Sequence, residues 1–169
     1  MENTAKLYSL NLAQTRSWLA ATIFVAGGIA LPQLAHLVPQ GGMILLPIYF
    51  FTLVSAYKYG LWVGLVTAVM TPLANHLLFA MPAAPMLLPI LAKGIALAFA
   101  AAYAAKWSGR VSILAILAAV MAYQLVGSAA EWALTGSLTA ALQDVRLGFP
   151  GIALQVFGGW ALLKALRKL

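Results

Sequence analysis

Long apolar runs separated by short polar breaks dominate the hydropathy pattern of this chain. A helix needs about 20 apolar residues to cross the hydrocarbon core of a bilayer. We therefore expect an all-α fold, an integral membrane bundle of six transmembrane helices over residues 17–169, preceded by a cytoplasmic or interfacial segment at residues 1–16. The pattern places the six helices at Ser17–Val38, Met43–Tyr57, Gly60–Ala80, Pro85–Ala105, Val111–Leu134 and Phe149–Leu166.

The composition strengthens the membrane assignment and excludes several classes of protein. Hydrophobic residues make up 64% of the chain and charged residues 8%, whereas a soluble domain is about half apolar and a quarter charged. The net charge of +7 sits at the ends of the apolar segments, so we expect a lipid bilayer as partner and no nucleic acid. The chain has no cysteine, which excludes disulfides, thiol redox chemistry and cysteine metal sites.

Lysine and arginine sort to one side of the predicted bundle. Cytoplasmic loops of membrane proteins carry an excess of these residues. The six-helix topology leaves only Arg146, beside Asp144, on the opposite side. We therefore expect both termini in the cytoplasm. The cytoplasmic set comprises Lys6, Arg16, Lys58, Lys106, Arg110, Lys164, Arg167 and Lys168.

Polar side chains at membrane depth concentrate in the outer half of the predicted helices. Such residues are costly in lipid and tend to face the bundle interior or a water-filled cavity. Prolines at positions 32, 47, 72 and 89 fall inside the same helices, where each removes a backbone donor. The pattern predicts a polar pocket that opens outward above a plugged inner half. Its candidate substrate-binding residues are Lys93, Glu131, His76, Asn75, Gln124, Gln155 and Ser128.

Each candidate also has a structural interpretation. Lys93 and Glu131 form either part of the pocket or an ion pair that fixes two helices. His76 is equally compatible with helix packing, and Gln124 and Gln155 with interhelical hydrogen bonds. The connection over residues 135–148 has a partly helical pattern, and it either caps the pocket or lies at the lipid headgroups.

The chemistry of these side chains constrains the ligand without identifying it. Lys93 and His76 suit a carboxylate or phosphate, so one expectation is an anionic small molecule. Glu131 suits an amine or a protonated ring nitrogen. No phosphate-binding loop, metal-binding motif or activated serine is present. We therefore expect no cofactor, no metal and no enzymatic activity.

Residues 45–73, LLPIYFFTLVSAYKYGLWVGLVTAVMTPL, carry a resemblance to a known family. Pro47, the turn at residues 58–60, and the spacing from Gly60 to Gly64 resemble the substrate-binding S component of energy-coupling factor (ECF) transporters. The Pro82 and Pro85 region and the fourth helix, rich in small residues, are also similar. The resemblance extends from about residue 16 to residue 166 and is a pattern of helices and turns.

The resemblance implies a high-affinity subunit of an importer of the ABC class in the prokaryotic cytoplasmic (inner) membrane. Such a subunit captures a vitamin or related micronutrient from outside. Its implied partners are a shared ECF transmembrane subunit and two cytoplasmic ATPases. The family contacts that shared subunit through an AxxxA motif in its first helix, and Ala26 and Ala30 match the motif here. Ser17 and Ala21 have the same spacing, and small residues four apart permit close helix approach to a partner or within the protein.

Two other functions remain open at this point. A self-contained small secondary transporter or channel would use Lys93 and Glu131 in an ion pathway. A structural membrane protein would bind no ligand. A polar pocket confined to the outer half favours the S component, because a free-standing carrier also needs a route inward.

Overall fold

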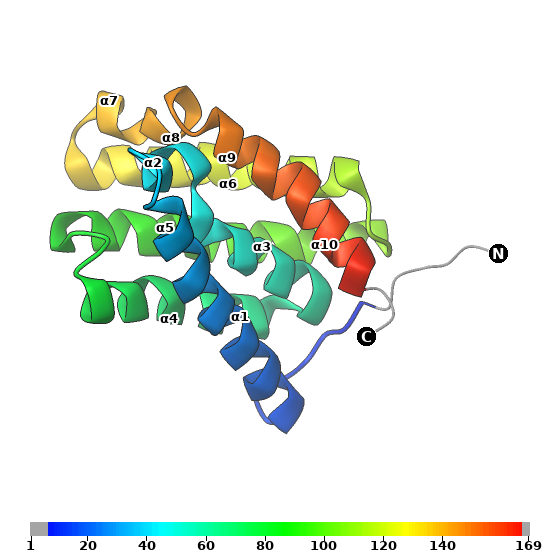
Figure 1. Ribbon diagram of the computed structural model, residues 1–169. Coiled ribbons are helices and arrows are strands. Elements are labelled where there is room, and N and C mark those ends of the chain that lie inside the picture. Colours follow the sequence, from blue (N-terminus) through cyan, green and yellow to red (C-terminus); the bar gives the residue numbers. More distant parts are fainter. Residues whose placement is uncertain (1–6, 167–169) are drawn as a thin grey trace.

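The computed structural model describes residues 7–166, and this part of the chain is helical with no strand. Turns and short connections join each helix to the next one along the chain (Figure 1). The elements are α1 (Thr15–Ala35), α2 (Gly41–Leu45), α3 (Pro47–Tyr59), α4 (Leu61–Phe79), α5 (Ala84–Ser108), α6 (Ile113–Thr135), α7 (Leu138–Ala141), α8 (Gln143–Arg146), α9 (Phe149–Ala153), the π-helical turn η1 (Leu154–Gly158) and α10 (Gly159–Ala165).

Five helical segments of the described chain are long and apolar enough to cross a membrane. They are α1, the pair α2–α3 taken together, α4, α5 and α6, and they are typical of a multi-pass membrane protein. The sixth predicted helix is different, because α9, η1 and α10 divide Phe149–Ala165 into three short pieces. The structure therefore supports five of the six predicted spans by length and composition and does not confirm the sixth.

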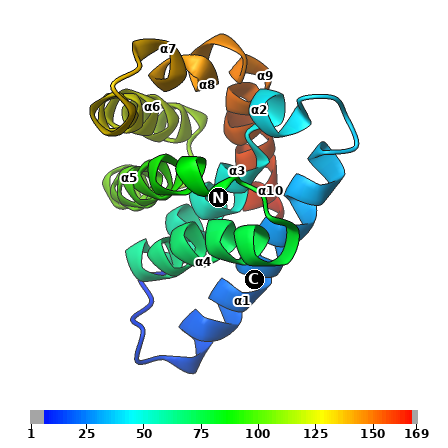
Figure 2. The same ribbon diagram turned by 90° about the vertical axis from the view of Figure 1, so that its left-hand side faces the viewer.

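Helices α4, α5 and α6 lie side by side, and α1 and α10 cross the molecule obliquely (Figures 1 and 2). Helix α5 packs against both α4 and α6. Its inward face carries Ala98, Ala101 and Ala105, and α6 presents Ala115 and Ala119 to the same core. Small side chains let helix backbones approach closely, which is the usual basis of packing where lipid supplies no hydrophobic drive.

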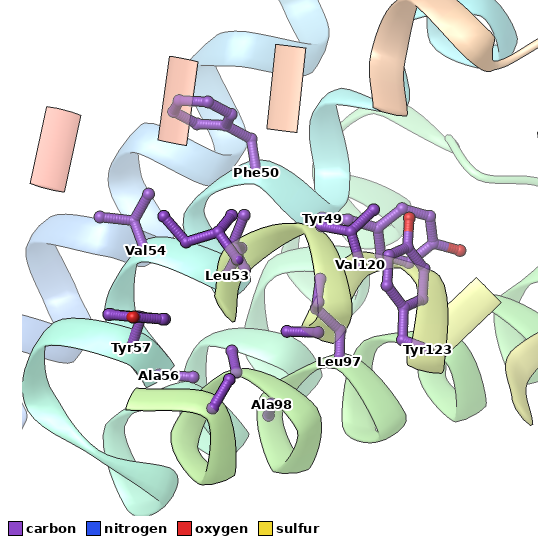
Figure 3. Close-up of a cluster of buried hydrophobic side chains, with 14 of the residues drawn as sticks. Tyr49, Phe50, Leu53, Val54, Ala56, Tyr57, Leu97, Ala98, Val120 and Tyr123 are labelled. Carbon is purple, nitrogen blue, oxygen red and sulfur yellow. The ribbon is translucent and has the colours of Figure 1, made fainter. Parts of the chain in front are cut away.

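Helix α3 occupies the centre of the molecule, and its residues from Thr52 to Lys58 are all buried. Leu53 and Val54 have no exposed surface and pack against Leu97 and Val120 in one apolar cluster (Figure 3). Large apolar side chains elsewhere point outward over α1, α4, α5 and α6. This distribution matches a protein whose exterior meets hydrocarbon.

The turn between α3 and α4 depends on two glycines. Gly60 has a φ of 96°, in the region that side chains other than glycine rarely adopt. At Gly64, an added Cβ would lie 2.4 Å from the Cβ of Ala56, so the two helices meet without room for a side chain. These contacts give a physical reason for the Gly60-to-Gly64 spacing noted in the sequence.

Two residues of α3 differ in their surroundings from what the sequence indicated. Lys58 was placed in the turn after the second predicted helix, but it lies in the last turn of α3 and its side chain is fully buried, with Nζ 5.2 Å from the ring centre of Tyr8. The N-terminal segment lies against this turn of α3, because Tyr8 N donates to Lys58 O at 2.8 Å. Pro47 was expected inside a helix, but it begins α3, where its missing N–H would be unpaired in any case.

Candidate functional site

A cavity of about 440 Å³ lies at the end of the molecule formed by the α1–α2 connection, the α4–α5 connection and α8. Figure 2 looks onto this end, which is the end predicted to face outward. Its volume is in the range of pockets that hold small organic ligands. The wall is largely apolar, with five prolines (32, 39, 47, 82 and 89) and three methionines (43, 81 and 86). Its polar lining residues are Gln33, His36, Gln40, Tyr49, Asn75, Lys93, Glu131, Gln143 and Asp144.

Three charged side chains form the base of this cavity, and we call them the Lys93 triad: Lys93, Glu131 and Asp144. The Nζ of Lys93 contacts the carboxylate of Glu131 and lies 2.8 Å from Oδ2 of Asp144. Lys93 and Glu131 are 2% and 3% exposed, whereas the Asp144 side chain is 14% exposed. The triad joins α5, α6 and α8.

The close approach of α5 and α6 gives Lys93 its path to Glu131. Gly127 on α6 faces the stem of Lys93, and an added Cβ there would lie 2.6 Å from Lys93 Cγ. Glu131 follows Gly127 by four residues, so both lie on the same face of α6. The glycine therefore leaves the space that the lysine stem fills.

A second polar contact fixes the opposite wall of the cavity. Asn75 on α4 donates through Nδ2 to Gly28 O at 3.0 Å and to Thr71 O at 2.9 Å. Its Oδ1 accepts from Gln33 Nε2 at 3.2 Å. Asn75 thus ties α4 to α1 and positions Gln33 at the cavity.

Behind the cavity, a buried polar network connects α6 to the π-helical turn. Tyr123 donates to Gln155 Oε1 at 3.0 Å and accepts from Gln124 Nε2 at 2.9 Å. Tyr49, which lines the cavity, packs against Tyr123 with ring centres 5.5 Å apart (Figure 3). A π-turn inserts one extra residue into a helix and is frequent at functional sites. Here it includes Gln155, which is fully buried against Tyr123.

The seven predicted binding residues separate into three groups. Lys93, Glu131 and Asn75 line the cavity. Gln124 and Gln155, like Ser128, are buried but lie outside the lining, in or near the network with Tyr123. His76 is also outside the lining, and its Nδ1 lies 2.7 Å from Pro82 O in the α4–α5 connection.

The sequence interpretation left one member of the triad out of the candidate site. Asp144 was noted only as the neighbour of Arg146, yet it binds Lys93 directly. The signal that could have identified Asp144 is the scarcity of acidic residues. The chain has three in all, and only two of them lie beyond its first two positions. The connection over residues 135–148 was expected to be partly helical and either to cap the pocket or to lie at the lipid headgroups. It contains α7 and α8 and supplies Gln143 and Asp144 to the cavity.

The small residues of α1 lie on two different faces. Ser17 and Ala21 are buried, and Ala21 packs in a small cluster with Val63 of α4. Ala26 and Ala30 are exposed. The first pair therefore serves packing within the protein, while the second pair remains available to a partner helix.

We expect Tyr123→Phe to destabilise the protein by about 1–3 kcal/mol, because it leaves buried amide groups of Gln155 and Gln124 without their partner. Thermal unfolding in detergent, followed by tryptophan fluorescence, measures this change. Tyr49→Phe is the matched control, since it removes a hydroxyl from the neighbouring ring at the cavity wall. An equal loss in both variants would contradict a special role for the Tyr123 network.

Comparison with known proteins found no relative of this chain. No protein-family model matches this chain, and searches of curated proteins and of solved structures found no similar protein. The function is therefore inferred from the geometry of the site and from the resemblance seen in the sequence.

Proposed function

We propose that this protein is the membrane-embedded substrate-binding subunit of an ECF-type importer of the ABC class. The observation that carries the proposal is a cavity of about 440 Å³ at one end of the helices, with charged groups at its base. Below it, the Tyr49–Tyr123 pair and the apolar cluster around Leu97 close the interior. A binding subunit needs this closed arrangement, whereas a free-standing carrier also needs a second opening.

The topology belongs to the same proposal. The segment α9–η1–α10 acts as the sixth span, crossing obliquely as in Figure 1. The excess of lysine and arginine at the end opposite the cavity sets that end in the cytoplasm. The cavity then opens to the outside of the prokaryotic cytoplasmic membrane, where it captures a vitamin-like small molecule. The partners in uptake are a shared ECF transmembrane subunit and two cytoplasmic ATPases.

Reconstitution in liposomes tests this function. We expect the protein alone to bind its ligand without moving it across the bilayer, because it has no energy source. Metabolites that remain bound through purification are identified by mass spectrometry and then offered to the liposomes in labelled form. Sustained ATP-independent uptake by the protein alone would contradict the proposal.

A self-contained transporter remains the second candidate because of the Lys93 triad. Ionisable groups buried at membrane depth often mark ion or proton pathways. In that case, uptake by the protein alone would depend on an ion gradient and disappear in Glu131→Gln. The same liposome experiment therefore separates the two functions.

The two faces of α1 give a test of the coupling surface. We expect Ala26→Trp to keep ligand binding and thermal stability, because Ala26 is exposed, and to reduce ATP-driven uptake in cells that supply the partner subunits. Ala21→Trp is the contrasting variant: Ala21 is 2% exposed, so overpacking should cost about 1–3 kcal/mol of stability. Undiminished uptake in Ala26→Trp would exclude this face from coupling.

A further inference from the structure

The charge balance of the cavity identifies the class of ligand more closely than the sequence does. The Lys93 triad contains one cation and two carboxylates, so at neutral pH its formal charge is −1. Among the described residues that line the cavity there is no arginine and no second lysine. His36 is exposed at the rim, and Arg146 is exposed and lies outside the lining.

The positive charge of Lys93 is therefore already compensated by carboxylates of the protein itself. Glu131 neutralises it from the long helix α6, and Asp144 of α8 lies 2.8 Å from it. A buried charge is costly unless a partner compensates it. The surplus negative charge lacks a partner among the described lining residues, and it borders an open cavity.

Asp144 is the carboxylate best placed to meet a ligand. Its side chain is 14% exposed, compared with 4% for that of Glu131. It lies on α8, a helix of four residues, next to Gln143, which also lines the cavity. An anion entering here would place a third negative charge beside a single lysine, whereas a cation would bring the group to neutrality.

We propose that the cavity binds a monocation, an amine or protonated nitrogen heterocycle with an apolar body, whose charge pairs with Asp144. The prolines and methionines of the wall contact the apolar body, and Lys93 holds the two carboxylates in place instead of binding an anion itself. This assignment rests on the proposed binding function and names its substrate class.

Three probes of similar shape and different charge test the assignment: phenethylammonium, 2-phenylethanol and 3-phenylpropanoate. A ligand that binds only the folded protein raises its melting temperature. We expect phenethylammonium at millimolar concentration to raise the melting temperature of the detergent-purified full-length protein more than 2-phenylethanol does. We expect 3-phenylpropanoate to give the smallest shift.

Two variants locate the contact. The phenethylammonium shift should be lost in Asp144→Asn and retained in Arg146→Gln, which removes an exposed charge from the same short helix. The comparison of the three probes on the unaltered protein needs no variant, so the proposal stays testable even when Asp144→Asn does not fold.

The outcomes separate the ligand class from the binding function. A larger shift with 3-phenylpropanoate or 2-phenylethanol would overturn the cationic class and leave a small-molecule pocket in place. A phenethylammonium shift that persists in Asp144→Asn would overturn the pairing with Asp144. No shift with any probe would count against the ligand class and the proposed function together.

Discussion

Lys93→Met lowers the thermal stability of the protein more than any other single change expected from this structure. The variant leaves Glu131 and Asp144 close together without their counter-charge. Removal of one partner from a buried ion pair typically costs about 3–5 kcal/mol, because the remaining charge stays desolvated. Thermal unfolding in detergent measures the loss.

Two controls identify the cause of that loss. Lys106→Met removes an exposed lysine from the same helix and should leave the melting temperature unchanged. The triple variant Lys93→Met, Glu131→Gln, Asp144→Asn removes the uncompensated charges and should recover part of the stability. If Lys93→Met melts at the wild-type temperature, the triad does not hold α5, α6 and α8 together.

Gly127→Ala is expected to displace Lys93 and to weaken ligand binding. The new Cβ would lie 2.6 Å from Lys93 Cγ and 3.4 Å from its Cα, so the lysine stem must move or the two helices must separate. Overpacking of this kind costs about 1–3 kcal/mol. Measurement of the melting temperature with and without a bound probe reports both effects.

Gly94→Ala is the matched control on the facing helix. Its added Cβ would lie no closer than 3.4 Å to Ala68, an ordinary contact distance. Alanine is also favoured over glycine in a helix by up to about 1 kcal/mol. We therefore expect Gly94→Ala to be neutral or stabilising, and equal losses in the two variants would contradict the role assigned to Gly127.

The sequence predicted the five long helices because their signal is local. Runs of apolar residues bounded by lysine, arginine, glycine and proline mark the ends of α1, α4, α5 and α6 to within a few residues. The division of the last segment into α9, η1 and α10 was not predicted, because the π-turn depends on the packing of Gln155 against Tyr123. Nothing in the hydropathy of residues 149–166 encodes that contact.

The site was partly predictable for a related reason. The sequence placed Lys93 and Glu131 inside predicted helices, with an ion pair between them as one of two interpretations. The structure contains that ion pair. Asp144 was missed because its position depends on how the connection after α6 folds back over the cavity. Gln124, Gln155 and Ser128 are buried but do not line the cavity. Which face of a helix meets the cavity depends on the rotation of the helix in the bundle, and residue spacing alone does not determine that rotation.

The methionines of the cavity wall also make the site sensitive to oxidation. Met43, Met81 and Met86 are all partly exposed at the cavity, and the chain has no cysteine that would react first. Conversion of a methionine to its sulfoxide replaces a flexible apolar side chain with a polar, chiral one. Oxidation of these three methionines should therefore make polar the wall that we propose to contact the apolar body of the ligand, and methionine sulfoxide reductase should reverse it.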